Sequence, residues 1–364
     1  MLRSHYDLRK TDDLEEVTKE VSELESEDVI EESAKIYKGP RRLHSSEISV
    51  RLSVLGKTAE GDSYAYLKAT CTSMGLVDVT ALIHFKHLQF VDLTDNALTS
   101  SSIQVLTKLP FLLLIQANKN LIDSPALKRM KFLQVIIMNN NKITSCNNVY
   151  QPELSTLEVG YNSIKDLYFN DPLPELKCLD VRYNLVCAIT ALEAPKLDSL
   201  YLAGNKIKSL IGISRLVNLR VLHLRFNPIK KLNGLEPSLT KLNYLNLRNC
   251  KVASKKQVKK LKLLPALQTL IIKGCPYMGG MGNEEVDQEP EEDSSLRVEV
   301  ISIIPRLQRL NKGVVTEDER KEAKELFIQV LQEEENEEIE EEDEEIEEQD
   351  EEVVDEDSVE EAIF

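Results

Sequence analysis

The chain of 364 residues is long enough for two or three ordinary domains or for one elongated domain. Hydrophobic residues make up 42% of it, but only 5% are aromatic and tryptophan is absent, a composition that suits thin stacked repeats better than a compact enzyme. The formal net charge of −17 is unevenly distributed, because residues 333–364 hold 21 acidic side chains and no Lys or Arg, which leaves a net +4 for the rest.

No stretch of the sequence has the character of a targeting or membrane-spanning segment. The first residues, MLRSHYDLRK, have no apolar core behind their basic residues. The longest apolar runs, such as FLLLI at 111–115, are far shorter than the roughly 20 residues that cross a bilayer. We therefore expect a soluble protein of the cytoplasm that does not bind membranes. The six cysteines lack metal-site spacing and are expected to be buried thiols.

The first 87 residues precede the regular part of the chain. Residues 1–45 are rich in charge and are expected to be disordered or only partly helical. Residues 46–87 contain the apolar stretch EISVRLSVLGKT and then a leucine spacing typical of an incomplete repeat. We expect residues 46–87 to form an N-terminal cap and half-repeat that covers the first full repeat.

Residues 88–277 repeat the pattern LxxLxLxxNxL nine times. The copies span 88–98, 112–122, 133–143, 154–164, 176–186, 197–207, 219–229, 242–252 and 267–277. The asparagine of the pattern is Asn96, Asn120, Asn141, Asn162, Asn184, Asn205 and Asn227, and Cys250 and Cys275 replace it in the last two copies. The separations of 21 to 25 residues predict an α/β fold, a leucine-rich repeat solenoid with a parallel sheet on its concave face and helical caps at both ends.

Each position of the repeat has a physical role in that fold. Every unit supplies one short strand, and its leucines can be buried only against the neighbouring units, so stability accumulates between neighbours. The asparagine lies where the chain turns out of the strand, and its amide can pair with backbone groups that water cannot reach. The seven asparagines are therefore predicted to form a structural ladder, in which cysteine can supply only a weak S–H donor.

The C-terminal part contains two acidic segments and a cap. Residues 278–295 are glycine-rich and then acidic, and are expected to form a loop insertion. Residues 296–332 are expected to form a C-terminal cap and helix, and the sequence TEDE at 316–319 has the pattern of a helix capping box. Residues 333–364 are expected to be a disordered acidic tail, either a solvated tail or a contact for a basic partner.

No group of residues has the pattern of a catalytic or cofactor site. The sequence lacks phosphate-binding glycine loops, the nucleophile motif GxSxG and the zinc motif HExxH. We therefore expect no enzyme activity, no cofactor, no metal and no small-molecule substrate.

The strand residues between the leucines are the ones that can contact a partner, because they point outward from the sheet. In the C-terminal half they combine arginine with aromatic side chains, the composition of protein-interaction hot spots. The predicted partner-binding residues are Tyr161, Arg182, Tyr183, Tyr201, His223, Arg225, Phe226, Arg248 and Lys273. Nucleic acid is not expected as a partner, because basic residues are few and the acidic tail would compete with phosphate.

The segment before and including the first repeat, Leu52 to Thr99, carries a more specific pattern. It contains the motif KT-x-x-G-x-x-x-AY, starting at Lys57, and is followed downstream by LEVGYNSI, LYLAGNKIKSLIGI, LHLRFNPI, LNYLNLRNCKVA and LQRLNKGVVTEDERKEA. With these pieces the chain resembles, over roughly Leu52 to Leu331, the leucine-rich repeat proteins of the radial spokes in motile cilia and sperm flagella.

The resemblance implies a non-enzymatic scaffold in the head region of a radial spoke. It implies a location in the cytoskeleton of the ciliary or flagellar axoneme, and other axonemal proteins, spoke head subunits among them, as partners. Two alternatives stay open: an acidic-tailed nuclear leucine-rich repeat protein that binds histones or inhibits a phosphatase, and a regulatory solenoid of phosphatase-1. The nuclear proteins start their repeats almost at the N-terminus, whereas here the first full repeat starts at Leu88.

Overall fold

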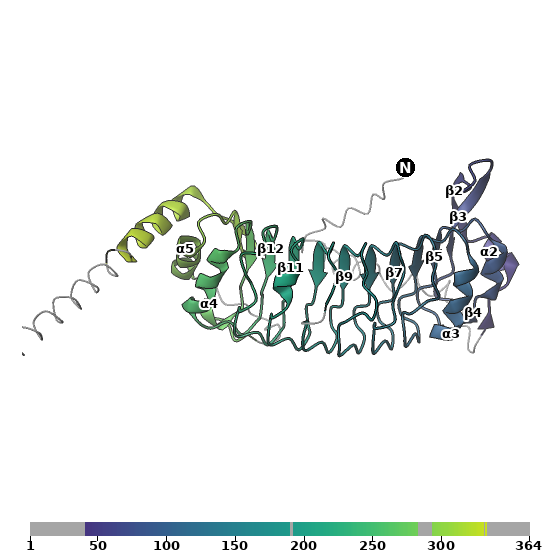
Figure 1. Ribbon diagram of the computed structural model, residues 1–364, viewed down its shortest axis with the longest axis horizontal. Helices are drawn as coiled ribbons and strands as arrows, with labels where there is room; N and C mark the ends of the chain where they lie inside the picture. Colours follow the sequence, from purple (N-terminus) through teal and green to yellow (C-terminus); the bar gives the residue numbers. More distant parts are fainter. Residues whose placement is uncertain (1–40, 190–191, 283–292, 331, 333–364) are drawn as a thin grey trace, which may run out of the picture. The chain divides into compact units, whose positions relative to one another are not determined.

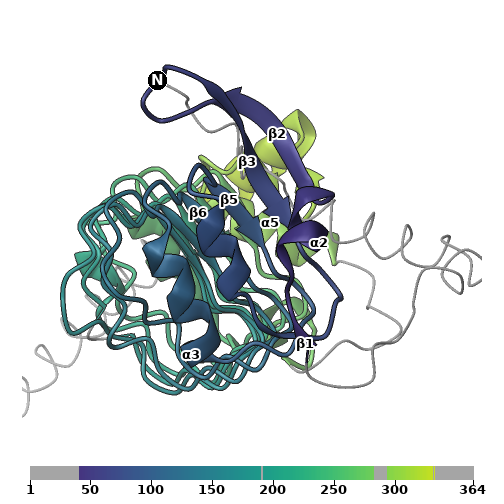
Figure 2. The same ribbon diagram turned by 90° about the vertical axis from the view of Figure 1, so that its right-hand side faces the viewer.

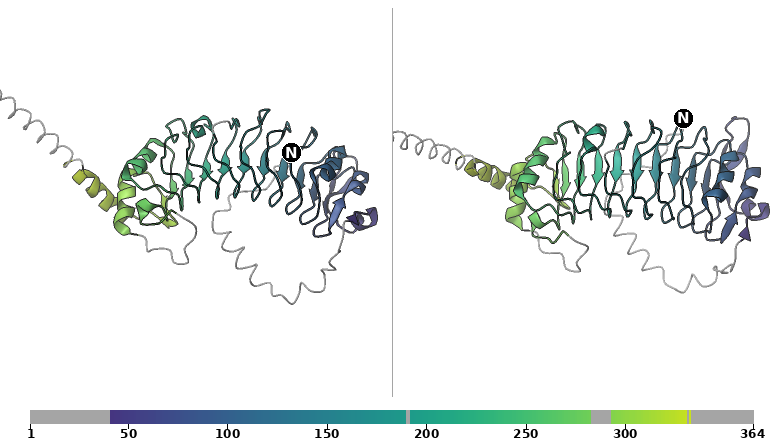
Figure 3. Two further views of the ribbon diagram at one scale, coloured as in Figure 1. Left: turned by 90° about the horizontal axis from the view of Figure 1, so that it is seen from below. Right: turned by 60° about the horizontal axis from the view of Figure 1, so that its bottom comes forward.

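A computed structural model describes residues 41–189, 192–282, 293–330 and 332. The segments expected to be disordered at 1–40 and 333–364, and most of the predicted acidic loop, lie outside the described residues. The described chain winds into a right-to-left series of coils (Figure 1), and thirteen strands form one sheet along one side of it. In Figure 3 the strands line the inner side of a gently arched solenoid.

Nine strands of three residues each come from the nine repeats. They are β5 (Phe90–Asp92), β6 (Leu114–Gln116), β7 (Val135–Ile137), β8 (Thr156–Glu158), β9 (Cys178–Asp180), β10 (Ser199–Tyr201), β11 (Val221–His223), β12 (Tyr244–Asn246) and β13 (Thr269–Ile271). All nine pair in parallel with equivalent residues side by side, so that Leu200 lies between Leu179 and Leu222. The leucines of the repeats are buried in one continuous core. These observations establish a leucine-rich repeat solenoid.

Short helices occupy the outer side of some coils. They are α3 (Ser100–Ile103), η2 (Gln104–Lys108), η3 (Ile213–Arg215), α4 (Lys255–Lys259) and η4 (Lys260–Leu263), the η elements being 3₁₀ helices. Coils of this length leave no room for a longer helix opposite the strand. Among the described residues, no helix has the length and apolarity that crossing a bilayer requires.

The N-terminal cap contains more β structure than the sequence suggests. Its elements are β1 (Arg41–Arg42), α2 (Ser45–Ser49), β2 (Leu52–Lys57), β3 (Tyr64–Thr70), β4 (Leu76–Asp78) and η1 (Thr80–His84). Strand β3 pairs in parallel with β5 and antiparallel with β2, which makes β2 the last strand of the sheet. The expected half-repeat is thus a complete coil, in which Met74 occupies the asparagine position.

Residues 41–45 differ from the expectation of a disordered or partly helical segment. Strand β1 pairs with β4, Leu43 is buried, and Arg41 forms an ion pair with Glu47. The segment is ordered because the pairing with β4 and the burial of Leu43 compensate for the loss of chain entropy.

The C-terminal cap consists of η5 (Pro276–Met278), α5 (Ser294–Ile303), β14 (Arg309–Leu310), β15 (Gly313–Val314) and a helix over residues 317–330. Thr316 and Glu319 form the predicted capping box, because the N–H of each donates to the side chain of the other at 2.7 and 3.3 Å. Asn311 also bonds to the preceding coil but from a different position, since it follows Leu310, the partner of Leu270, and its Oδ1 accepts the N–H groups of Ile272 and Lys273 at 2.9 Å.

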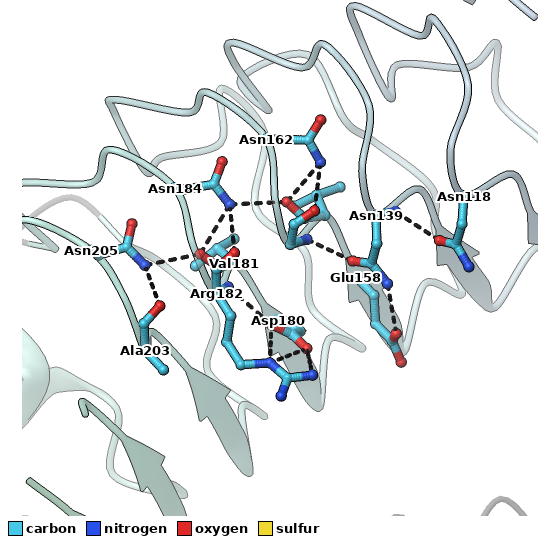
Figure 4. A network of polar contacts seen from close by, with 12 residues as sticks. Asn118, Asn139, Glu158, Asn162, Asp180, Val181, Arg182, Asn184, Ala203 and Asn205 are labelled. Atoms are coloured by element: carbon cyan, nitrogen blue, oxygen red, sulfur yellow. Dashed lines mark hydrogen bonds and ion pairs between the residues drawn. The ribbon is translucent and has the colours of Figure 1, made fainter. Parts of the chain in front are cut away.

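The asparagine side chains connect each coil to the one before it (Figure 4). The amide nitrogen of Asn205 donates to the carbonyl oxygens of Val181 and Leu202, both at 3.0 Å, and of Ala203 at 3.3 Å. Its Oδ1 accepts the N–H of Val186 at 3.0 Å. Six other asparagines likewise donate one hydrogen bond to a carbonyl oxygen of the preceding coil and accept one from a backbone N–H of that coil. They are Asn96, Asn120, Asn141, Asn162, Asn184 and Asn227.

The cysteines that replace asparagine preserve only half of this arrangement. The thiol of Cys250 donates to the carbonyl oxygen of Leu224 at 3.2 Å, and that of Cys275 to Leu247 at 3.1 Å. A thiol is a weak donor and cannot bridge three carbonyls as an amide does.

The ladder predicts unequal effects of alanine at equivalent positions. Asn205→Ala leaves the N–H of Val186 without a partner and removes three donations to carbonyl oxygens that each keep one other donor. We expect a loss of about 3 kcal/mol of unfolding free energy, because an unpaired buried group costs about 1–3 kcal/mol and each lost hydrogen bond adds to it. Cys250→Ala removes one weak bond and is expected to cost about 1 kcal/mol. Urea unfolding of both variants measures the difference. Equal losses would contradict the structural role of the amide.

Candidate protein-interaction surface

The outward-facing residues of the sheet follow the strand alternation. In β10 and β11 the middle residue is buried and the first and third are partly exposed. A third outward residue follows two positions later, as Arg225 does after His223. Each coil therefore presents three outward residues, and the first of them, the position of Val221 and Tyr244, is absent from the predicted partner-binding residues.

All nine predicted partner-binding residues retain exposed surface, although only Tyr161 is largely exposed. Some of their outward neighbours do not. Asp180 and Asn246 have only 5% and 2% of their surface exposed, and Ala203 and Ile271 are also buried. The part of the sheet available to a partner is therefore narrower than the outward alternation implies, and the large side chains dominate it.

The first row of the surface runs along the turns that follow the strands. The rings of Tyr161 and Tyr183 are stacked, with centroids 4.6 Å apart and an interplanar angle of 15°. The hydroxyl oxygen of Tyr183 accepts a hydrogen bond from Nη2 of Arg225 at 3.2 Å. The Arg225 guanidinium lies 5.2 Å from the ring centroid of Phe226. The space for the Tyr183 ring exists because its neighbour is Gly204, where a Cβ would lie 2.5 Å from the ring.

The second row lies on the strands themselves. Tyr201, His223 and Tyr244 form a continuous stack of three rings, with both centroid separations 4.8 Å. The guanidinium of Arg182 lies 5.7 Å from the centroid of Tyr201 at the open end of this stack. Tyr244 is a member that the sequence reasoning missed. The signal for it was available, since Tyr244 stands two residues before Asn246 at the omitted first outward position.

We call these ten residues the aromatic–arginine surface: Tyr161, Arg182, Tyr183, Tyr201, His223, Arg225, Phe226, Tyr244, Arg248 and Lys273. Both rows hold their rings in place by stacking and cation–π contacts, so a partner that binds them would lose little side-chain entropy in the protein.

Acidic and basic groups meet at the N-terminal edge of this surface (Figure 4). Arg182 forms an ion pair with the buried Asp180, with Nη2 and Oδ2 2.8 Å apart. Burial raises the pKa of the neighbouring Glu158 carboxyl, and the charge of Asp180 raises it further. Burial also raises the pKa of Tyr201 to about 12, so its phenol is neutral at physiological pH.

The C-terminal end of the surface is positively charged. Arg225, Arg248 and Lys273 occupy the same outward position on three adjacent coils. None of the outward strand positions of β11, β12 and β13 carries an acidic residue. The surface therefore attracts acidic side chains at this end and presents aromatic rings beside them.

The residue before each ladder position has a left-handed backbone. Its φ is positive in every repeat, as for Tyr161 (54°), Tyr183 (50°), Phe226 (57°) and Asn249 (53°). Glycine and asparagine adopt this conformation readily, but other residues lose roughly 1–2 kcal/mol in it. Tyr161, Tyr183 and Phe226 therefore hold aromatic rings at the turns despite this cost.

Five of the six cysteines are buried, whereas Cys187 is exposed, contrary to the expectation of six buried thiols. The described residues contain no cluster of three or more His, Cys, Asp or Glu that could hold a metal ion. Burial raises the pKa of the Cys146, Cys178 and Cys275 thiols to about 12, so they are not nucleophiles at neutral pH.

A sequence profile described as Leucine Rich repeats (2 copies) matches residues 195–237. Fold, surface and profile together define a leucine-rich repeat protein, a class whose sheet surface serves as an interaction scaffold. The human leucine-rich repeat-containing protein 23 is 32% identical to this chain over 303 residues, which cover 83% of this chain and 84% of the human protein. The proteins of the same name from Bos taurus and Mus musculus are 31% and 30% identical, and cover 76% and 86% of this chain and 77% and 92% of their own length. The chain belongs to the leucine-rich repeat-containing protein 23 family.

Solved structures with a similar chain course include an internalin, InlF, from Listeria monocytogenes and a TDR receptor. InlF is 17% identical with a TM-score of 0.41 over 69% of this chain and 84% of its own. The receptor is 17% identical with a TM-score of 0.45 over 67% of this chain and 42% of its own.

A substitution at one of the aromatic residues with left-handed backbone tests whether its ring contributes to the stability of the fold. Phe226→Asn replaces a strained residue by one that the equivalent position in the next coil, Asn249, already uses. We expect the unfolding free energy to stay within about 1 kcal/mol of the wild type or to rise, because Asn relieves the strain. Thermal and urea unfolding measure it. A loss well above that figure would mean that the ring is a packing element of the fold.

The partly buried carboxyl of Glu158 predicts a pH effect. Because the pKa of Glu158 is raised in the folded state, the folded protein binds more protons than the unfolded chain between the ordinary and the raised pKa, and stability falls as pH rises through this window. Glu158→Gln, which can still accept from Asn139, is expected to be more stable than the wild type above the window and to lose that advantage at lower pH. Unfolding curves between pH 4 and 8 test this. An unchanged difference across the range would exclude it.

Proposed function

We propose that the protein is a non-enzymatic scaffold of the ciliary or flagellar axoneme, in the head region of a radial spoke, and that its aromatic–arginine surface holds a neighbouring axonemal subunit. The proposal is supported by membership of the leucine-rich repeat-containing protein 23 family and by the resemblance of the chain to radial-spoke repeat proteins. The single structural observation that supports it most is the ordered set of stacked rings and arginines on adjacent strands.

The physical basis is that of a protein–protein hot spot. Tyr and Arg dominate the binding energy of such surfaces because they bury large areas at a small entropy cost. Here Tyr183 and Phe226 lie beside Arg225, which contacts both. The surface lies on a solenoid whose coils are joined rung by rung, so the contact groups keep fixed separations, as a structural scaffold requires.

Other partner classes fit the surface less well. A nucleic-acid backbone would meet the carboxylates of Glu158 and Asp180 at one end of the same surface. A small molecule would need a concave pocket with convergent polar groups, whereas the rings and cations here spread over six successive strands, β8 to β13.

A double variant tests the function without disturbing the fold. Tyr183→Asn with Phe226→Asn removes two rings at positions where asparagine is sterically favourable, and Lys119→Asn, at the same left-handed position in an earlier coil, is the matched control. The variants are expressed in ciliated cells in place of the native protein. The amount of the double variant that stays bound in isolated axonemes should be at least tenfold lower than that of the wild type. The control should be retained. Crosslinking mass spectrometry of the axonemes should place spoke head peptides against the surface only in the control and the wild type.

Two outcomes would contradict the proposal. Full retention of the double variant would exclude the surface as the anchor. Nuclear accumulation of the wild type, with histones or a phosphatase catalytic subunit co-purifying, would instead favour the nuclear or phosphatase-regulating alternatives.

A further inference from the structure

The hairpin formed by β2 and β3 extends past the first coil of the solenoid (Figures 1 and 2). Strand β3 continues the sheet, since Lys68 pairs with Phe90 and Thr70 with Asp92. Strand β2 is the terminal strand of the thirteen in the described part of the chain. A terminal strand presents a row of backbone donors and acceptors along its outer edge, on which another strand can form.

The hairpin carries a concentration of exposed apolar side chains. Val54, Leu55, Tyr64 and Tyr66 expose 53%, 64%, 67% and 51% of their surface, whereas of the rings in the aromatic–arginine surface Tyr161 alone reaches a similar exposure, 49%. Leu55 lies directly opposite Tyr66, and Lys57 opposite Tyr64. These two pairs therefore form one apolar and basic face that the fold does not bury.

The sequence motif KT-x-x-G-x-x-x-AY accounts for the shape of the hairpin but not for this face. Thr58 is buried, and its N–H donates to the carbonyl oxygen of Ser63 at 2.9 Å to close the loop. Gly61 has a φ of 82°, which the loop requires. Thr58 and Gly61 thus have structural roles, whereas the exposed Leu55, Tyr64 and Tyr66 have none within the described residues.

The backbone at Val54 is strained. Its φ of 61° places a β-branched residue in the left-handed region, and the residue is half exposed at the middle of β2. Such a conformation is rare for valine and costs roughly 1–2 kcal/mol, so its occurrence on an exposed edge marks a site where the strain is offset by a function.

We infer that the outer edge of β2 binds an extended segment of a partner protein by strand addition, and that this segment has apolar residues at its centre and acidic residues at the end that lies beside Arg51 and Lys68. Main-chain hydrogen bonds to the edge would supply affinity, and the side chains would pack against Leu55 and Tyr66.

Charge identifies the occupant. The only charged residues on β2 and β3 are Lys57 and Lys68, and Arg51 directly precedes β2. The loop between the strands adds Glu60 and Asp62 beyond Lys57, so the uncompensated positive charge lies at the start of β2, where Arg51 and Lys68 stand, and acidic residues of a strand added there would complement it.

A second copy of the chain fits the edge poorly. In a two-fold antiparallel pairing through the middle of β2, Lys57 of one copy would lie beside Arg51 of the other, and like charges facing each other across strands are destabilising. A six-residue edge is also too short to bury the roughly 1,000 Å² that a stable specific interface needs. A short linear segment of another protein, anchored elsewhere as well, avoids both problems.

The test uses the purified full-length chain and two synthetic ten-residue peptides. Both have alternating valine and threonine at the centre, flanked in one peptide by glutamates and in the other by lysines. We expect the acid-flanked peptide to bind at least tenfold more tightly in calorimetry than the lysine-flanked one, and amide hydrogen exchange to show protection along β2. Equal binding of both peptides, or protection elsewhere, would overturn the inference.

Variants assign the binding to the hairpin. Leu55→Ser with Tyr66→Ser should weaken binding of the acid-flanked peptide at least tenfold, while Ile211→Ser with Val217→Ser, which removes two apolar residues exposed by 61% and 46% on the outer part of another coil, should not. Val54→Gly should keep or raise the melting temperature while it weakens binding. Equal loss in both double variants would indicate nonspecific apolar contact. Sedimentation showing a dimer that the Leu55 and Tyr66 substitutions dissociate would assign the edge to a second copy and exclude the proposed partner.

Discussion

The hydrogen bonding of the turn that follows each strand is the constraint on which the rest of this structure depends. A coil of 21 to 25 residues is too thin to shield its own backbone, so the turn buries donors and acceptors that water cannot reach. An asparagine amide satisfies them because it has two donors and an acceptor in one plane, and because it reaches both its own turn and the coil before it. The coils are therefore held by two kinds of contact, buried leucines and the amide ladder, and both act only between neighbours.

The ladder also determines what the surface can carry. In every repeat the residue before the ladder position has a left-handed backbone, and so does Ser73, which precedes Met74 in the coil of the N-terminal cap. The same geometry directs the side chain of that residue out over the sheet edge, so the position which strains the backbone also displays the side chain. Where the chain has Gly204, the position costs nothing and displays nothing, but the vacated space admits the Tyr183 ring. Backbone strain and an outward-pointing side chain therefore occur together at the residue before each ladder position, which is where the aromatic residues of the first row stand.

Much of this could be predicted from the sequence, and the limits have physical causes. The strands of the nine repeats follow from the leucine frame, because in a solenoid the leucines that recur in every repeat are the residues buried between neighbouring coils. The hairpin did not follow, since β3 buries Leu67, Ala69 and Cys71 in place of the leucine frame and uses Met74 where the frame has asparagine. The strand members of the aromatic–arginine surface follow from alternation, except Tyr244, whereas Tyr161, Tyr183 and Phe226 stand at the turns just before the ladder positions. Their pairing into two rows was not predictable, because it depends on rotamers and on which ring faces which across strands, as with Arg225 reaching Tyr183 two coils away.

The two surfaces differ in chemistry and stand at a fixed distance from each other. The aromatic–arginine surface lies on side chains of the central and C-terminal strands, whereas the edge of β2 offers backbone groups with an apolar and basic face. Six strand spacings separate β3 from β10, which corresponds to roughly 30 Å along the sheet at the usual spacing of about 4.8 Å. The rungs between the coils oppose a change in that separation, because each rung is a set of buried hydrogen bonds. A solenoid with two such surfaces can hold two different proteins at a set spacing, and the number of repeats between the surfaces, rather than any single residue, fixes that spacing.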